Sequence, residues 1–509
     1  MLPPRSHHRL ATVTVAFSVI VLYFFRSLTL TIIIDQNRTN INEFSSQNWE
    51  HQKLPQWLDN YFHWHNSMRH QYPGLSLFTH PDSPGVLIKS CAFKCGGLHD
   101  RFGGLGWDLY LANQTKRVLL IHWCIPAPIE YYLVPNVVDW TLPRNGNDRE
   151  LEEKKDDDFI LDERLFSNTT ETHFHCDRAV QSWPGLFDGY SESRPGVEFW
   201  ESQVDLALHR AIHGEYAHNA ILRVQILGFD VYLEKRLRER HGEMDAISWT
   251  DSFPTVFWRM FRPSKGLQKE LDAAFVDLGL LPSSTASSSS MDKNSAMITE
   301  KITASSPSLP PFYAIHVRIR HPRGHVSISM KGNPDKFGLE WEDGPTRDFA
   351  VNVSEHAFHC AQQRAHLLVI DERRRSNTNP SALLTAIQKP TAYVFFADSE
   401  ELVTHMGNEY REHGLRVRNI IGKEVVHIDR QQEMSPESYY DSFVDLFVAA
   451  EASCIIFGAG NYALLAAKIN RRGARQCLVR HYPDSSHSLV LRNEFLDCDE
   501  TYNLARMQF

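Results

Sequence analysis

The sequence has fewer positive than negative side chains. Its 509 residues include 53 lysines and arginines against 62 aspartates and glutamates, a formal net charge of -9. Nucleic-acid-binding proteins usually present a basic stripe to the phosphates, so this balance argues against a nucleic-acid partner. Any phosphate that the protein binds must then be met by a few locally placed groups.

Several catalytic and metal-binding motifs are also missing. The sequence has no Gly-x-Ser-x-Gly turn and no His-Glu-x-x-His helix, which disfavours a hydrolase. The glycine-rich stretch 95–106 has no lysine after its last glycine, so it is not a P-loop. Cys91 and Cys95 have a spacing close to that of zinc ligands, but no second Cys/His pair at finger spacing follows. We therefore expect neither a metal site nor a cofactor.

What the sequence does have is enough apolar residues for a folded protein and an even set of cysteines. With 42% hydrophobic and 23% charged residues, the chain can bury two substantial cores. An oxidising compartment could pair the eight cysteines into as many as four disulfides, and their connectivity stays open. These cysteines are Cys91, Cys95, Cys124, Cys176, Cys360, Cys454, Cys477 and Cys498.

One long apolar run lies near the N-terminus, over residues 10–34. It is interrupted by a single charge, Arg26, and is long enough to cross a bilayer as one helix. A cleaved signal peptide is the alternative, but no clear small-x-small cleavage site follows the run. Basic residues precede the run and Asp35 follows it, so the positive-inside rule predicts a cytoplasmic tail over residues 1–9. The expected product is a single-pass type II protein with a lumenal body.

Glycosylation signals fit that orientation. Sequons of the form Asn-x-Ser/Thr are used on the lumenal side of the secretory pathway, although a chain of this length collects some by chance. They lie at Asn37, Asn113, Asn168 and Asn352.

The remaining chain divides into four parts. Residues 35–83 are polar with scattered aromatics, which predicts a stem. Apolar blocks with alternating strand and helix patterns predict an α/β domain over 84–281 and a second, doubly wound one over 312–509. The Ser-rich tract 282–311 predicts a flexible linker between them. The expected strands include 118–122, 222–227, 312–317, 392–397, 425–428 and 454–457, and the expected helices include 107–112, 267–275 and 441–452.

Two segments could meet a phosphate. The loop 95–106 leaves backbone amides free to approach a ligand just before an expected helix, although a tight structural turn explains it equally well. Arg318 and Arg320 lie at the end of the first strand of the second domain, where open α/β sheets bind ligands. One of them could point at a diphosphate as a bidentate donor, and a structural ion pair is the alternative for either.

Two further segments place polar groups at strand and helix ends. Asp398 follows an apolar strand and could bind a ribose or a base, or cap the next helix. Asp445 lies on an expected helix that leads into a buried strand and the glycine turn before Asn461, again a possible cradle for sugar or phosphate. Asp445 could equally be an exposed helix residue.

In this order, the four segments resemble the GDP-fucose fucosyltransferase superfamily. The matching motifs are the Gly-Gly-Leu-x-Asp-Arg loop, the His-Val-Arg strand end, the Ala-Asp-Ser-Glu-Glu turn, and the Asp-Leu-Phe helix with Ile-Ile-Phe-Gly-x-Gly. That superfamily holds the core α1,6-, the nodulation and the protein O-fucosyltransferases, and the resemblance covers residues 89–468 with long insertions. It implies a GT-B architecture, two facing Rossmann-like domains with the nucleotide sugar mainly on the second. It also implies metal-independent, inverting transfer of fucose from GDP-fucose.

The resemblance also implies roles for particular residues. Arg318 looks like the arginine that binds the donor diphosphate, Asp398 and Asp445 match acidic positions that hold the guanine or ribose, and a first-domain loop faces the cleft. The implied donor-binding residues are His316, Arg318, Arg320, Asp398, Asp445, Gly460 and Asn461, and those of the cleft loop are Gly97, Asp100 and Arg101.

This chain departs from the family pattern at three positions. Ile319 stands where members often have a second arginine, and Arg320 comes one step later on the opposite strand face. His99 replaces a common glycine, and Asn461 replaces a small hydroxyl residue while keeping an amide that can donate.

The implied mechanism assigns catalytic roles to two residues. Positive charge on Arg318 would stabilise the departing diphosphate. Asp100 is the first choice for the base that deprotonates the acceptor, with Asp343 and Glu342 as open alternatives.

We therefore expect a fucosyltransferase of the Golgi or endoplasmic reticulum membrane that acts on a glycan or glycoprotein. A transferase that uses another GDP-sugar is the near alternative. A membrane-anchored carbohydrate-binding or scaffold protein that has lost turnover is the alternative from another class.

Overall fold

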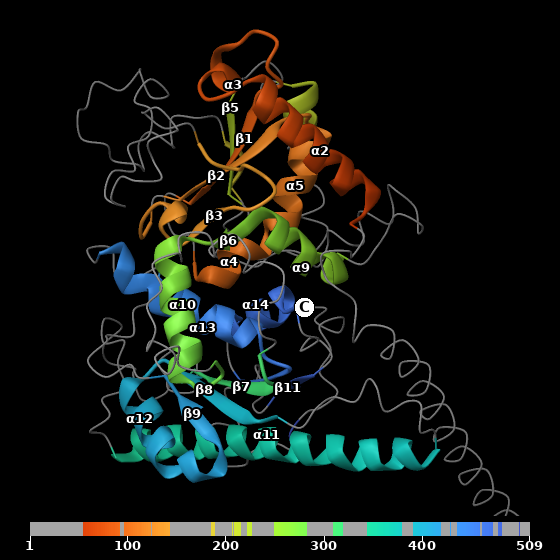
Figure 1. Ribbon diagram of the computed structural model, residues 1–509. Coiled ribbons are helices and arrows are strands. Elements are labelled where there is room, and N and C mark those ends of the chain that lie inside the picture. The colour runs from red at the N-terminus through yellow and green to blue at the C-terminus, as the bar shows by residue number, and fades with distance from the viewer. Residues whose placement is uncertain are drawn as a thin grey trace, which may run out of the picture.

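A computed structural model shows two α/β halves, one stacked on the other, with helices between them (Figure 1). Within the described residues, no helix combines the length and the apolar character needed to cross a membrane. The expected anchor 10–34 and most of the expected linker 282–311 lie outside those residues. The structure describes residues 54–91, 96–123, 125–142, 185–188, 206, 208–214, 221–225, 249–281, 309–318, 344–378, 390–418, 428, 435–458, 461–471, 477–480 and 498.

The N-terminal half is built on a parallel sheet in the order β2-β1-β5-β4. Strands β1 and β2 are runs of mostly Val, Leu and Ile buried along their whole length, as expected for parallel strands covered on both faces. Helix α5, Leu105–Gln114, packs on β1 and β2. The strands are β1 Val86–Cys91, β2 Val118–Trp123, β4 Gly185–Asp188 and β5 Ile221–Gln225.

Helix α2, Gln56–Gln71, packs against β2 at the edge of this sheet. The Tyr61 hydroxyl donates to Arg117 O and accepts from Leu119 N, both at 3.0 Å. His65 Nε2 lies 2.9 Å from Leu119 O. The sequence predicts a stem as far as residue 83, whereas this helix within that range is part of the folded core. The polar composition of this segment favoured the stem prediction over a packed helix.

The C-terminal half has a five-stranded parallel sheet in the order β11-β10-β7-β8-β9. The chain starts at the central strand β7, proceeds outward through β8 to β9, and returns to the other side of β7 for β10 and β11. The doubly wound α/β prediction is therefore confirmed, and the strand order reverses between β7 and β10. The strands are β7 Phe312–Val317, β8 Ala392–Ala397, β9 Leu415–Val417, β10 Cys454–Phe457 and β11 Leu478–Arg480.

Alternate residues of β7 face opposite sides of this sheet. Tyr313 and Ile315 join the apolar cluster under α11 and α12, on the face away from the N-terminal half (Figure 1). Phe312 and Ala314 join the cluster that includes α13 and α14, on the face toward it. The helices are α11 Gly344–Thr378, α12 Glu400–Glu409, α13 Tyr440–Ala450 and α14 Tyr462–Ile469.

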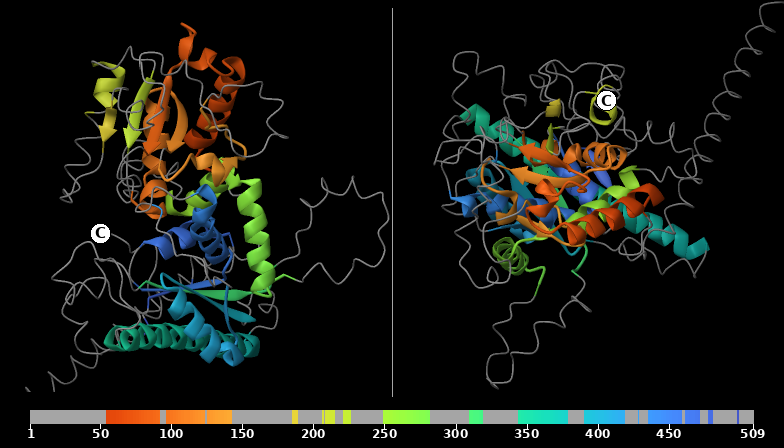
Figure 2. Two further views of the ribbon diagram at one scale, coloured as in Figure 1. Left: turned by 90° about the vertical axis from the view of Figure 1, so that its left-hand side faces the viewer. Right: turned by 90° about the horizontal axis from the view of Figure 1, so that it is seen from above.

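One apolar core runs across the boundary between the halves. The ring of Tyr132 stacks on that of Phe443, with 4.6 Å between centroids. Helix α10 crosses the boundary, extending from the N-terminal half toward the C-terminal sheet, and packs on α13 (Figure 2). Helices α4 and α9 pack on α14. The N-terminal helices involved are α4 Leu98–Gly103, α9 Trp249–Met260 and α10 Lys265–Asp277.

Smaller elements complete the described chain. Strands β3 and β6 form an antiparallel ribbon beside the boundary. The bounds are β3 Leu133–Pro135 and β6 Phe261–Pro263, the short helix α3 Ser76–Thr79, and the 3-10 turns Ile129–Tyr131, Arg411–His413 and Pro436–Tyr439.

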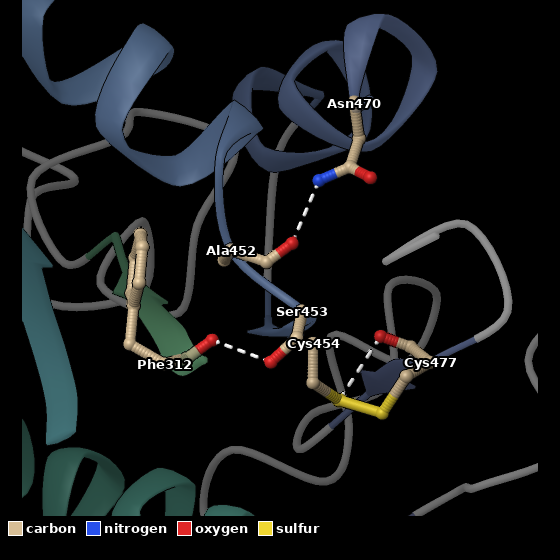
Figure 3. The surroundings of a disulfide bond; sticks show 6 residues. All are labelled: Phe312, Ala452, Ser453, Cys454, Asn470 and Cys477. Carbon is tan, nitrogen blue, oxygen red and sulfur yellow. Dashed lines mark hydrogen bonds between the residues drawn. A yellow bond between two sulfur atoms is a disulfide. The ribbon is translucent and has the colours of Figure 1, made fainter. Parts of the chain in front are cut away.

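Two disulfides lie in the C-terminal half. Cys454, the first residue of β10, is bonded to Cys477, which precedes β11 (Figure 3). Next to it, the Ser453 hydroxyl donates to Phe312 O at 2.9 Å. The second disulfide joins Cys360 of α11 to Cys498. The expectation that cysteines of this chain pair is confirmed for these four.

Candidate functional site

The candidate site lies where β7 and β10 end. His316 pairs in register with Phe457 of β10, and α14 starts close by. The His316 ring stacks on Tyr462, the first residue of α14, with 5.1 Å between centroids and 25° between planes. The carboxyl end of parallel strands at a reversal of strand order is where open α/β sheets bind ligands.

His316 is a neutral group at this edge. Burial, and then the charge of Arg318, lowers the pKa of His316 to about 3. Its Nδ1 is buried and has no hydrogen-bond partner in the described part of the chain. His316 can therefore exchange a hydrogen bond with a ligand, while the positive charge at the end of β7 comes from Arg318.

Asp100 approaches the same edge from the N-terminal half. Its Oδ2 accepts a hydrogen bond of 3.0 Å from Gly97 N at the start of α4, and its Oδ1 lies 3.9 Å from His99 Nδ1. Burial alone would raise the pKa of Asp100, but His99, the Gly97 amide and the charge of Arg318 together hold this pKa below its usual value. Helix α4, which carries Asp100, packs on α14 of the C-terminal half, so this carboxylate lies within the electrostatic influence of Arg318.

The loop before α4 needs a glycine at Gly96. This residue has φ +67°, and a Cβ there would lie 2.8 Å from Asp100 Cβ. A larger residue would therefore displace the carboxylate from the Gly97 amide.

Arg101 has a more buried place than the sequence resemblance implies. Its side chain is buried, Nε donates to Gly96 O at 3.1 Å and Nη2 reaches Ile428 O of the C-terminal half at 3.5 Å. Its guanidinium also lies 4.7 Å above the Trp123 ring. Through these contacts Arg101 holds the glycine-rich loop against Trp123 and against Ile428 of the C-terminal half.

Asp398 is half-buried at the end of β8, directly before the N-cap of the next helix. The N-cap of α12 is Ser399, whose hydroxyl accepts from Leu402 N at 3.3 Å. Ser399 therefore supplies a side-chain cap at the position that the sequence offered as one role for Asp398, and Asp398 itself follows β8, the strand beside β7, at the carboxyl edge of the sheet.

Asp445 is neither exposed nor alone. Its Oδ1 lies 2.8 Å from Nη2 of Arg418, the residue that follows β9, and Nη1 of the same arginine pairs with Asp441. Sequence reasoning missed Arg418. The available signal was the alternation Leu-Arg-Val-Arg over 415–418, which resembles a strand end with a charged residue.

Of the other predicted positions, some lie within the described residues and some lie outside them. Asn461 lies at the start of α14, where its side chain makes no capping hydrogen bond. Asn113 is half-buried near the end of α5, and Asn352 is exposed on α11. The predicted positions outside the described residues are Arg320, Gly460, Asn37 and Asn168, together with the alternative bases Glu342 and Asp343.

One group of side chains in the described chain has the spacing of metal ligands. It consists of His356, Cys360 and Cys498, with His356 Nε2 3.7 Å from Cys360 Sγ. The two sulfurs are bonded to each other, so they are not thiolate ligands in this state. His356 and Cys360 belong to α11, which lies on the face of the sheet away from the N-terminal half (Figure 1).

No family model matches this chain, and no curated protein matches it. Among solved structures, it is similar to Arabidopsis thaliana FUT1 in complex with GDP, with a TM-score of 0.40, 11% identity, and coverage of 85% of this chain and 80% of FUT1. The NodZ α-1,6-fucosyltransferase soaked with GDP-fucose has a TM-score of 0.34 and 11% identity, with coverage of 79% of this chain and 96% of NodZ. POFUT1 in complex with GDP-fucose has a TM-score of 0.34 and 10% identity, with coverage of 79% of this chain and 98% of POFUT1. At these TM-scores the likeness carries no weight for the site, whose function has to be inferred from this chain's own residues.

Proposed function

We propose that this protein is a GT-B glycosyltransferase that transfers fucose from GDP-fucose to a glycan or glycoprotein, with inversion and without a metal. The observation that carries the proposal is the position of Arg318. It follows β7 at the reversal of strand order, beside the neutral His316 and within electrostatic reach of Asp100 from the other half. These three residues come from the segments that the sequence resemblance singles out.

A diphosphate fits this edge for physical reasons. An arginine can donate two parallel hydrogen bonds to phosphate oxygens, and its charge compensates a diphosphate without a metal. Helix α14 also begins five residues after the end of β10, and a helix N-terminus favours anions. Asn461 stands at that N-terminus, where its amide can donate to a phosphate or sugar oxygen.

The proposed reaction needs charge stabilisation on one side of the anomeric carbon and an acceptor on the other. The acceptor oxygen forms a bond to C1 as the bond to the GDP oxygen breaks, which inverts C1. Arg318 stabilises the negative charge that develops on GDP, and the acceptor proton passes to a carboxylate or to water. Asp100 is ionised, as a base must be, but its lowered pKa makes it a weak one.

The test is donor use by the purified protein and its Arg318 variants. With a panel of nucleotide sugars, we expect GDP release from GDP-fucose that depends on an added glycan or glycoprotein. Removing one such charged donor should cost roughly 100-fold or more in turnover, so Arg318→Ala should lose both GDP binding and transfer. Arg262→Ala is the matched control, because Arg262 is an exposed arginine of β6 that donates to Pro135 O at 3.1 Å.

The outcomes separate the alternatives. GDP release from a different GDP-sugar would replace fucose in the proposal. Saturable GDP binding that Arg318→Ala abolishes, with no transfer to any acceptor, would favour the carbohydrate-binding or scaffold protein. Wild-type levels of binding and transfer in Arg318→Ala would contradict the assignment of the site.

We also propose that the body lies in the lumen of the Golgi or endoplasmic reticulum, held by residues 10–34. The exposed sequon at Asn352 and the two disulfides support this location. Expression in a secretory cell should give a carbonate-resistant membrane protein whose mobility shifts on endoglycosidase treatment, with a smaller shift for Asn352→Gln. An unglycosylated, carbonate-extractable protein would contradict it.

A further inference from the structure

We propose that Arg418 is a positioning residue for the donor site. It holds Asp441 and Asp445 as a fixed pair of carboxylates on one face of α13, ready to accept hydrogen bonds from the donor nucleotide. The inference rests on the proposed function, because it concerns how the same site binds GDP.

The contacts of Arg418 define its role. Its side chain is 8% exposed, and its two terminal nitrogens are each used by a different carboxylate, Nη1 by Asp441 and Nη2 by Asp445 at 2.8 Å. The two aspartates are four residues apart on α13 and therefore lie on the same side of the helix. One guanidinium thus joins the end of β9 to α13 at two points.

Without this cation, the two carboxylates would be unfavourable neighbours. Each is only 26% exposed, and like charges four residues apart on a helix repel each other. Burial alone would lower the pKa of Arg418, but Asp445 and Asp441 raise it above its usual value. The pair and the arginine therefore keep one another charged.

The pair is connected to the ligand-binding edge through Tyr462. The Tyr462 hydroxyl donates to Ser442 O of α13, and the Tyr462 ring stacks on His316 next to Arg318. Burial, and then the charge of Asp445, raises the pKa of Tyr462, partly offset by Arg418. A displacement of α13 would therefore reach the His316 ring through one intervening side chain.

The geometry needs an arginine at this position. A lysine would keep the charge but offers a single point donor, whereas the planar guanidinium matches two acceptors at once. Within the described residues Arg418 pairs with Asp441 and Asp445, so it acts on the edge through these aspartates and Tyr462.

The test is the pH dependence of GDP binding, measured by calorimetry from pH 5.5 to 8 on the full chain. The charged and titratable groups around Arg418 are Asp441 and Asp445 from α13 and Tyr462 from α14. GDP itself titrates at roughly pH 6, so the profile to compare is the ratio of each variant's Kd to that of the wild type at the same pH, and a variant without an effect on the carboxylates gives a flat profile. In Arg418→Met the unpaired carboxylates should take up a proton, giving an inflection in this range and at least tenfold weaker binding at pH 5.5.

Two variants keep the test decisive. Arg418→Lys should restore the flat profile but raise KM for the donor three- to tenfold with kcat within twofold. It carries the test if Arg418→Met does not fold. Arg416→Met is the matched control, because Arg416 lies two residues earlier on β9 and bonds instead to Leu278 O at 2.6 Å. It should leave the profile flat.

Three results would overturn the inference. Wild-type affinity and a flat profile in Arg418→Met would do so, as would a wild-type KM in Arg418→Lys. An equal, pH-independent loss in Arg418→Met and Arg416→Met would reduce Arg418 to a structural role. In each case GDP binding by the wild type would leave the proposed function standing, whereas a wild type that binds no GDP would overturn both.

Discussion

Trp258 of the N-terminal half donates its indole N–H to Ile469 O of the C-terminal half at 2.8 Å. The same ring lies 3.6 Å beneath the guanidinium of Arg471 and packs on Phe447. A single side chain therefore makes polar, cationic and aromatic contacts across the boundary, within a core that both halves share.

We predict that the two halves unfold together and that Trp258→Phe weakens both. Losing the indole donor leaves a buried carbonyl unpaired, which should cost about 1–3 kcal/mol. Urea unfolding followed by circular dichroism should show a single transition, shifted to lower urea in the variant. Two separate transitions in the wild type would show that the boundary is weak.

Asp100→Asn should lower turnover less than tenfold. An asparagine oxygen can still accept from Gly97 N, so the loop keeps its shape, and both carboxylate oxygens of Asp100 already face partners within their own loop. Asp100→Ala should lower turnover much more than Asp100→Asn, because the loop loses the hydrogen bond from Gly97 N. Initial rates of transfer would decide, and a loss of 100-fold or more in Asp100→Asn, the size expected for a lost general base, would assign the base role to Asp100.

Stability should fall as the pH drops from about 6.5 to 4. Burial, only partly opposed by the bond to Leu119 O, lowers the pKa of His65 to about 4. The unfolded chain then binds a proton in this window that the folded chain does not, so protonation favours unfolding as the pH decreases. His65→Gln should reduce the slope by about 1.4 kcal/mol per pH unit at most, measured by urea unfolding at each pH. His63→Gln, at an exposed position of the same helix, should leave it unchanged.

The two disulfides should stabilise the protein by different amounts. Cys454–Cys477 closes 23 residues of sequence and Cys360–Cys498 closes 138. The chain-entropy relation gives about 3 kcal/mol for the short loop and about 5 kcal/mol for the long one. Urea unfolding of Cys454→Ala/Cys477→Ala and of Cys360→Ala/Cys498→Ala would measure both. The opposite ranking would show that strain or residual structure outweighs loop entropy.

Three central strands of the C-terminal sheet were the most predictable part of the fold, whereas its short outer strands β9 and β11 were not predicted. The bounds expected for β7, β8 and β10 are those found, because strands buried on both faces appear as short unbroken apolar runs. Helix α13 begins one residue before its predicted start and ends two residues before its predicted end, as expected where caps are weak. The expected strand 425–428 lies mostly outside the described residues.

The features that escaped prediction depend on contacts between distant segments. Helix α2 has a polar composition, and its place follows from the bonds that Tyr61 and His65 make to a strand more than 50 residues away. The role of Arg418 could not be predicted because it depends on two carboxylates that α13 brings next to it in the folded chain. Arg101 belongs to a motif, but its burial follows from the way the two halves meet.

The place of α2 sets a limit on how short a chain can still fold. Among the described strands β2 lies at the edge of its sheet, where α2 bonds to it, and an uncovered edge offers its backbone to other chains. A protein shortened to begin at Leu54 keeps the helix that occupies this edge, whereas one that begins at Ser83 leaves it open to aggregation. If residues 10–34 anchor the protein as proposed, we expect a protease that releases the body to cut before Leu54, so that α2 stays on the edge of β2.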